Sequence, residues 1–234
     1  MDNILWDELD VVVFDVDGTL YCQSKLRKIM LLKLVLHYVF RPWKYRELLV
    51  IYHFRKEREK RAGYRGSNLQ EEQYNWCAQK TNEKLDFIKR VVDRWIFEEP
   101  NRYLKECMYP GVSVFIELLR KKGIRTAIYS DYESIKKLKC MDIKVDLEVS
   151  STDPEINSFK PNSEGLTFIL SKMKATGKDK CLFIGDRYEL DGLCARELQV
   201  PFLLIKEETA LKGFYVTLAD KISISGYNNV INDR

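Results

Sequence analysis

The chain has 234 residues, of which 45% are hydrophobic and 12% aromatic, so it holds enough apolar side chains for a packed core and is not a disordered protein. Its length fits one α/β domain with an insertion, or two small domains. The net charge of +4 is uneven, because residues 25–61 carry twelve Lys or Arg against three Glu, a local +9, which leaves −5 for the remainder.

Several classes of protein are disfavoured by local composition. The six cysteines show no C-x-x-C spacing or close pairing, which is typical of reduced thiols rather than a disulfide framework or a zinc site. Residues 1–10 are polar and acidic, so we expect no signal peptide. The longest apolar stretch, residues 29–40, is interrupted by Lys33 and His37 and is shorter than the roughly 20 residues of a membrane span. We therefore expect a soluble, cytoplasmic protein; its oligomeric state has no sequence signal.

The first predicted element is a short buried strand. Residues Val11 to Phe14 are apolar and mostly β-branched, and the run ends abruptly at Asp15-Val16-Asp17-Gly18-Thr19. A fully apolar run that stops at a turn is typical of a parallel strand covered on both faces. This strand is expected to be the first and central member of the sheet.

The next block, residues 22–106, contains no convincing strand. Helical periods recur in it, for example at Leu85, Ile88 and Val92, and residues 61–68 look like a loop between helices. The charged stretch from Arg55 to Arg61 is predicted to be a solvated helix end. We interpret the block as an all-helical cap domain inserted after the first strand.

Beyond residue 107, strands and helices alternate. Strands are predicted at 126–129, 146–149, 181–184 and 202–205, and helices at 112–121, 163–174 and 190–197. This alternation predicts an α/β fold with a doubly wound, mainly parallel, Rossmann-like sheet. The core domain would comprise residues 1–21 and 107–234. The last of these helices has no glycine at its end, and a left-handed Gln199 there would cost about 1 kcal/mol.

Polar side chains follow the predicted strands where each one ends. These ends carry Asp15, Asp17, Ser130 and Asp186, with Asp191 shortly after, and the carboxyl ends of parallel strands converge on one crevice. Close carboxylates repel each other by several kcal/mol per pair at an effective dielectric of about 20, so their ionisation requires a cation. Oxygen ligands without His or Cys suit Mg²⁺.

The motifs resemble those of the haloacid dehalogenase superfamily, in its phosphatase branch. Asp15-Val16-Asp17-Gly18-Thr19-Leu20 is similar to its first motif and Ser130 to its second. Lys160-Pro161 is similar to the third, and Gly185-Asp186-x₄-Asp191 to the fourth. The helical block resembles the family's cap inserted between the first two core strands.

This resemblance implies a role for each residue. Asp15 would be the nucleophile that forms an aspartyl-phosphate, and Asp17 the general acid and base. The metal would be held by the carboxylates of Asp15 and Asp186 and the main-chain carbonyl of Asp17, with Asp191 acting through water or by orienting Lys160. The phosphate would be bound by Ser130, the N–H of Asp131, Lys160 and the turn at Gly18.

The implied function is a Mg²⁺-dependent phosphatase for a small phosphorylated metabolite, with no nucleic-acid partner. Two alternatives stay open, namely a phosphomutase that uses the same nucleophile and a non-catalytic protein that binds a partner or a membrane through the basic cap. The physiological substrate and the cap residues that select it have no readable signal.

The basic segment, residues 25–61, has several interpretations. Lys33, His37, Arg41 and Lys44 recur at helical spacing, and we favour a stripe that faces the active-site crevice and attracts an anionic substrate. A solvated face, an oligomer contact or a peripheral membrane contact through residues 25–61 are the alternatives.

Overall fold

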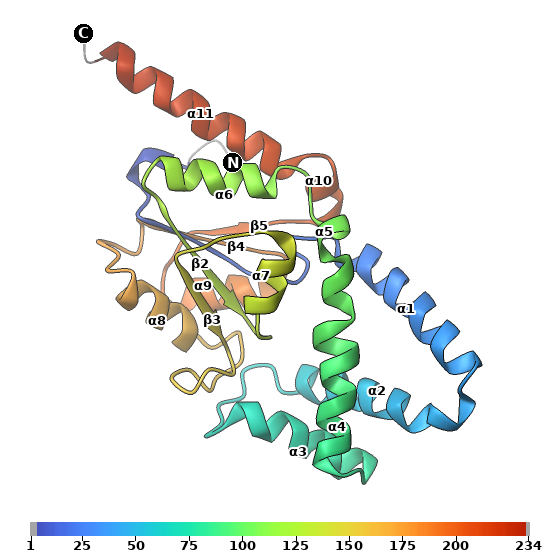
Figure 1. The fold of residues 1–234 in the computed structure, drawn as a ribbon. Coiled ribbons are helices and arrows are strands. Elements are labelled where there is room, and N and C mark those ends of the chain that lie inside the picture. The colour runs from blue at the N-terminus through green and yellow to red at the C-terminus, as the bar shows by residue number, and fades with distance from the viewer. Residues whose placement is uncertain (1–3, 233–234) are drawn as a thin grey trace.

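A five-stranded parallel sheet forms the centre of the molecule. The computed structural model describes the backbone of residues 4–232 and the side chains of residues 4–223. The strand order is β3-β2-β1-β4-β5, with every neighbouring pair parallel. The strands are β1 Val11–Phe14, β2 Arg125–Ser130, β3 Leu147–Ser150, β4 Cys181–Gly185 and β5 Phe202–Leu204. The doubly wound α/β fold and the central place of the first strand are confirmed (Figure 1).

The two faces of the sheet carry separate apolar cores because side chains alternate along β1. Val12 and Phe14 pack into the larger cluster, which also includes Phe115 and Tyr215. Val11 and Val13 belong to the other cluster, with residues from α8 and α9. The predicted apolar run of β1 is therefore completely buried because helices cover both of its faces.

The helices of the core follow the predicted alternation. Helices α6 and α11 lie on one face of the sheet, and α8 and α9 on the other (Figure 1). Their bounds are α6 Val112–Lys121, α7 Ile135–Met141, α8 Glu164–Lys172, α9 Leu193–Glu197, α10 Glu207–Leu211 and α11 Phe214–Asn232. A 3₁₀ turn, Trp6–Glu8, precedes β1.

All elements between β1 and α6 are helical, as predicted for the cap. They are α1 Gln23–Val39, the 3₁₀ turn Pro42–Lys44, α2 Tyr45–Glu59, α3 Leu69–Thr81, α4 Leu85–Val92, the π-turn Asp93–Glu98, the 3₁₀ turn Pro100–Tyr103 and α5 Leu104–Cys107. The cap projects from one side of the sheet, with α1 and α2 as its outer arm (Figure 1). Within the described chain, no helix is long and apolar enough to cross a membrane.

Helix α9 begins later than predicted. The expected helix over residues 190–197 is regular only from Leu193, and a π-turn, Tyr188–Gly192, precedes it. In this turn the Arg187 carbonyl accepts hydrogen bonds from three successive amides, of Leu190, Asp191 and Gly192. The wider turn directs Asp191 toward the site described below. Gln199 has φ +59°, so it adopts the left-handed conformation that is costly for a residue other than glycine.

Candidate active site

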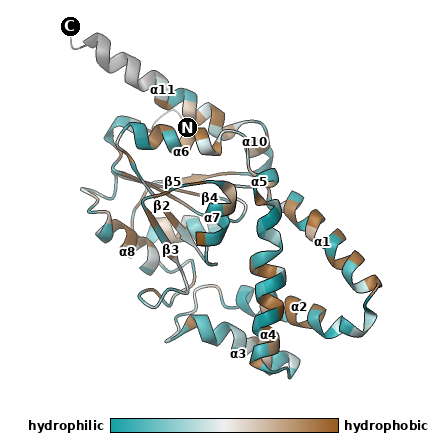
Figure 2. Ribbon diagram, viewed as in Figure 1, coloured by the Kyte–Doolittle hydropathy of each residue, from teal (hydrophilic) through white to brown (hydrophobic). Residues whose placement is uncertain are grey.

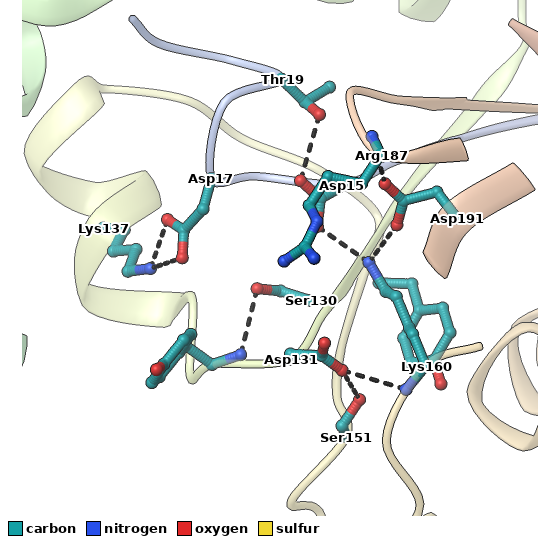
Figure 3. A network of polar contacts seen from close by, with 12 residues as sticks. Asp15, Asp17, Thr19, Ser130, Asp131, Lys137, Ser151, Lys160, Arg187 and Asp191 are labelled. Atoms are coloured by element: carbon teal, nitrogen blue, oxygen red, sulfur yellow. Dashed lines mark hydrogen bonds and ion pairs between the residues drawn. The ribbon is translucent and has the colours of Figure 1, made fainter. Parts of the chain in front are cut away.

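The nucleophile candidate Asp15 lies just beyond β1, at the carboxyl edge of the sheet. The residue is 8% exposed, and its Oδ2 accepts a hydrogen bond of 3.0 Å from the Thr19 hydroxyl (Figure 3). Gly18 makes this turn possible in two ways. Its φ is +94°, and a Cβ there would lie 2.2 Å from Asp186 Oδ2. Any larger residue at this position would displace Asp186 from the site.

Lys160 connects two of the predicted carboxylates. Its ammonium is 2.8 Å from Asp15 Oδ1 and 2.7 Å from Asp191 Oδ1, and its side chain is 2% exposed (Figure 3). Burial opposes the charge, but Asp15 and Asp191 outweigh it and hold the pKa of Lys160 well above its usual value. The structure thus contains a charged lysine fixed between the first and fourth motifs.

Three carboxylates come close enough to share a metal ion. One oxygen each of Asp15, Asp186 and Asp191 lies within 4.8 Å of the others. Burial, reinforced by the neighbouring carboxylates, raises the pKa of Asp15 to about 7 and that of Asp186 to about 8. Asp186 Oδ1 is buried without a hydrogen-bond partner. A hard divalent cation fits this set, because it would satisfy the free oxygen and relieve the repulsion.

Asp17 points away from this cluster. Lys137 Nζ is 2.5 and 2.7 Å from its two carboxylate oxygens (Figure 3). The Tyr21 hydroxyl also donates a hydrogen bond to Asp17. Burial would raise the pKa of Asp17, but the Lys137 ammonium outweighs it and lowers the pKa. The expectation of four converging carboxylates is therefore met by three of them. Asp17, the fourth carboxylate, is held at the edge of the site by Lys137, which lies 120 residues further along the chain.

Ser130 and Asp131, at the second motif, present polar groups at the end of β2, and Asp131 also hydrogen-bonds to the backbone of Lys160. Ser130 ends β2 and is buried, and its Oγ accepts a hydrogen bond from the Tyr132 amide. Asp131 Oδ1 accepts from the Ser151 hydroxyl at 2.6 Å and from the Lys160 amide at 3.2 Å. The Asp131 side chain therefore fixes the loop that carries Lys160 (Figure 3).

A cavity of about 550 Å³ lies between the core and the cap; it reaches Lys160, while Asp15, Asp186 and Asp191 are not among its lining residues. Its floor includes Asp17, Asp131 and Lys160, and its walls include apolar residues of the cap. These apolar lining residues are Leu26, Met30, Leu31, Leu34, Ile51, Trp95, Ile96 and Leu104. The cavity therefore offers a polar end and an apolar end to a bound molecule.

The cations that line this cavity differ from those predicted. Lys33, His37, Arg41 and Lys44 do not line it, whereas three other cations of the basic segment do, namely Arg27, Arg55 and Arg58. The favoured stripe was therefore wrong. Two of these arginines, Arg55 and Arg58, lie on α2 rather than on α1. The sequence could not show which helix, or which side of it, packs against the core.

Arg58 was also expected in solvent, at a charged helix end, and that prediction was wrong. It is 6% exposed and donates a hydrogen bond of 2.5 Å to the Asp131 carbonyl. Its guanidinium stacks 4.0 Å from the Tyr132 ring centroid and 4.5 Å from that of Phe159. These aromatic contacts compensate for removing Arg58 from water.

Residues 61–68, the predicted loop between cap helices, contact the loop of the core that carries Lys160. The Gly63 amide donates to the Lys160 carbonyl at 2.9 Å, and the Phe159 amide donates to the Tyr64 carbonyl at 3.0 Å. Sequence reasoning gave no sign of this junction, since it depends on backbone groups. Thr19, Tyr21 and Lys137 were also missed as site residues; the first two lie inside or beside the first motif, and Lys137 had no signal.

The sequence matches the model of a known protein family. A family model described as haloacid dehalogenase-like hydrolase matches residues 9–198. No curated protein matches the chain at a significant level.

The fold is similar to those of solved structures, and the three described next each have a TM-score of 0.52. One is a haloacid dehalogenase phosphatase from Thermococcus onnurineus, 18% identical over 85% of this chain and 86% of that one. Another is a candidate β-phosphoglucomutase from Thermotoga maritima, 18% identical over 88% and 98%. A third is CbbY from Rhodobacter sphaeroides in complex with phosphate, 15% identical over 84% and 85%. Identities this low support the shared fold.

Proposed function

This chain belongs to the haloacid dehalogenase-like hydrolases, and from that premise we propose that it hydrolyses a phosphate monoester of a small metabolite through a covalent aspartyl-phosphate on Asp15. The observation that carries this proposal is the buried contact of Lys160 with both Asp15 and Asp191. It places a permanent positive charge beside the nucleophile, where phosphoryl transfer needs it.

In the first half-reaction, a carboxylate oxygen of Asp15 attacks phosphorus in line with the ester bond. The new O–P bond forms as the ester O–P bond breaks, and the leaving oxygen takes a proton from the protonated form of Asp17, a form that the ion pair with Lys137 disfavours before substrate binds. In the second half-reaction Asp17 removes a proton from water, which attacks the phosphorus. Inorganic phosphate leaves and the Asp15 carboxylate is restored. Lys160 stays charged throughout, and Ser130, the Asp131 amide and the Gly18 turn bind phosphoryl oxygens.

The carboxylates of Asp15 and Asp186 and the main-chain carbonyl of Asp17 would hold Mg²⁺, with Asp191 in the outer shell. When bound, the ion neutralises charge on the phosphoryl oxygens and on Asp15. Asp191 then has a second task, because its contact with Lys160 orients that ammonium. The unpaired Asp186 oxygen supports this ligand set.

We place the cap at residues 22–106 and the core at residues 1–21 and 107–234, of which residues 1–3 and 233–234 lie outside the described residues. In this arrangement the core binds the phosphoryl group and the cap selects the rest of the substrate. The loop at Gly63 and Tyr64 transmits cap position to Lys160 through backbone hydrogen bonds. Cap closure would exclude bulk water from the phosphorylated enzyme.

The test is hydrolysis of an aryl phosphate with Mg²⁺ by the wild type and by Asp15→Asn. We expect turnover in the wild type, loss of at least a thousandfold in the variant, and an acid-stable, hydroxylamine-sensitive acyl phosphate in the wild type alone. Asp153→Asn, which changes a carboxylate outside the cluster, is the matched control. Turnover that survives in Asp15→Asn would refute the nucleophile.

A panel of phosphorylated metabolites distinguishes hydrolysis from phosphoryl return to the substrate. Release of inorganic phosphate in proportion to substrate loss supports a phosphatase. Formation of an isomeric sugar phosphate without release would instead identify a phosphomutase. Neither product, with every candidate substrate and the metal present, would favour a non-catalytic protein.

A further inference from the structure

The outer arm of the cap exposes an extended apolar surface. Of nineteen large hydrophobic side chains that are exposed in the described chain, eleven lie between residues 31 and 52. We call this surface the arm face. Its members are Leu31, Leu32, Val35, Leu36, Val39, Phe40, Trp43, Tyr45, Leu48, Leu49 and Tyr52. Apolar patches of this extent on soluble proteins mark interaction sites.

The arm face is continuous along the helix rather than scattered. Leu32, Val35, Leu36 and Val39 recur at helical spacing on α1, and Trp43 in the turn and four exposed residues of α2, at the same spacing, follow them in the chain. Figure 2 shows apolar segments along α1, on the arm that projects from the sheet. Trp43 is 70% exposed at the tip of this arm.

The same segment is strongly basic. No Asp or Glu occurs between Asp17 and Glu47, while seven Lys or Arg do. In the described chain only two of these seven, Lys44 and Arg46, form ion pairs with carboxylates. An apolar helix face with unneutralised cations beside it and Trp and Tyr at its end is typical of helices that bind a lipid surface.

A cationic cleft adjoins the tip of the arm. It has a volume of about 800 Å³ and is lined by Trp43 together with residues from α2, the α3–α4 turn and the α4 region. The cations in its lining are Lys44, Arg46, Lys84, Arg90 and Arg94. Its two carboxylates are already engaged, because Glu47 accepts from the Tyr38 hydroxyl and Lys44, and Glu83 pairs with Arg46.

The remaining cations of this cleft attract anions. In the described chain Lys84, Arg90 and Arg94 have no ion-pair partner, and Arg94 and Arg41 both act to lower the pKa of His37, after burial as the main cause. The cleft is therefore a positive region directly beside the exposed Trp43. A phosphate-bearing headgroup has the charge that would neutralise it.

We propose that the arm face docks on an anionic lipid surface, with its apolar side chains in the interfacial layer and the cleft over the headgroups. A second copy of the chain fits less well, since residues 31–52 carry four Lys or Arg against one Glu, and two such surfaces, each at +3, would repel each other. The face also reaches the catalytic cavity, because Leu31 belongs to both. Docking does not depend on the hydrolytic proposal.

Trp43 provides a direct probe. The other three tryptophans, Trp6, Trp76 and Trp95, are at most 8% exposed. The full chain is mixed with vesicles of phosphatidylcholine alone or with about a third phosphatidylglycerol. We expect co-sedimentation and a blue shift of tryptophan emission with the anionic vesicles only, and no shift in Trp43→Phe.

Matched variants separate the two parts of the surface. Leu36→Ser with Phe40→Ser should abolish the shift. Val114→Ser with Leu211→Ser, two apolar residues more than half exposed elsewhere, should preserve it. Arg90→Gln with Arg94→Gln should weaken vesicle affinity about thirtyfold, at about fivefold per charge. Lys139→Gln with Lys212→Gln is the charge control.

Three results would overturn the docking proposal. They are no binding to either vesicle, binding that the Leu36 and Phe40 variant retains, and a dimer in sedimentation equilibrium with Trp43 already shielded from an aqueous quencher. Hydrolysis of a water-soluble aryl phosphate is measured in parallel on every variant. Its retention shows that each variant is folded, and its absence in the wild type would count against the hydrolytic proposal alone.

Discussion

Replacing Asp186 with Asn should stabilise the metal-free protein while destroying its metal response. Folding raises the pKa of Asp186 from 3.8 to about 8, first through burial and then through Asp15 and Asp191. The folded state therefore holds this proton more tightly than the unfolded chain does. The metal-free protein consequently loses stability as the pH rises from about 4 to about 8, and Asn, which is neutral at every pH, avoids that loss.

The magnitude follows from the pKa difference. At about 1.4 kcal/mol per pKa unit, the rise from 3.8 to about 8 bounds the penalty near 6 kcal/mol at high pH. Asp186 is partly accessible to solvent, and relaxation lowers this bound, so we expect Asp186→Asn to gain about 2–4 kcal/mol at pH 8. At pH 5 the same reasoning limits the gain to below about 2 kcal/mol.

Urea unfolding in EDTA at pH 5 and pH 8 measures these differences. Asp10→Asn is the control with the opposite sign, because two hydrogen bonds from Thr176 lower the pKa of Asp10 and its replacement should destabilise the protein. Added Mg²⁺ should then stabilise the wild type and leave Asp186→Asn unchanged. A gain for Asp186→Asn that is absent at pH 8, or equal at both pH values, would refute the repulsive cluster.

Three further predictions follow from the same site. Lys160→Met should abolish aryl phosphate turnover. It should also lower the free energy of unfolding by about 3–5 kcal/mol in urea titrations at pH 8, because Asp15 and Asp191 lose their buried counter-ion. An unchanged free energy of unfolding would contradict this prediction. Lys137→Met should raise the pKa of Asp17, because the ammonium that lowers it is removed. The basic limb of the plot of kcat/KM against pH should then move to higher pH. A basic limb that does not move would exclude Asp17 as the general acid. Replacing Mg²⁺ with Ca²⁺ should stop turnover in the same assay while still raising the Tm. The larger ion binds the carboxylates, but its looser coordination does not hold the substrate for in-line attack. Equal turnover with both ions would contradict this prediction.

The sheet was predictable because its signals are local. The run from Val11 to Phe14 is apolar throughout and ends at a Gly-containing turn, and parallel strands covered on both faces require that pattern. The convergence of Asp15 and Asp186 followed from topology, as strand ends in such a sheet meet at one edge, whereas Lys160 lies in a loop beyond β3 and was implied only by the family resemblance. The side-chain roles assigned to them remain predictions.

The contacts of Asp17 could not be predicted in this way. Lys137 lies in a lysine-rich stretch of α7 whose sequence is typical of a solvated helix, and its pairing with Asp17 depends on how α7 packs at the end of β2. Arg58 was misjudged for the same reason. Its aromatic neighbours Tyr132 and Phe159 come from segments more than 70 residues away.

Helix α1 shows most clearly where sequence periodicity stops being informative. A surface helix ordinarily has one apolar stripe, and that stripe identifies its buried side. Here Leu26, Met30 and Leu34 line the catalytic cavity, while Leu32 and Leu36 are exposed on the other side. With apolar residues on both sides, the pattern fixes no orientation, and the basic residues between them were assigned to the wrong side. The second apolar side is costly to expose and has no partner within the described chain, which is the physical reason to seek that partner outside it.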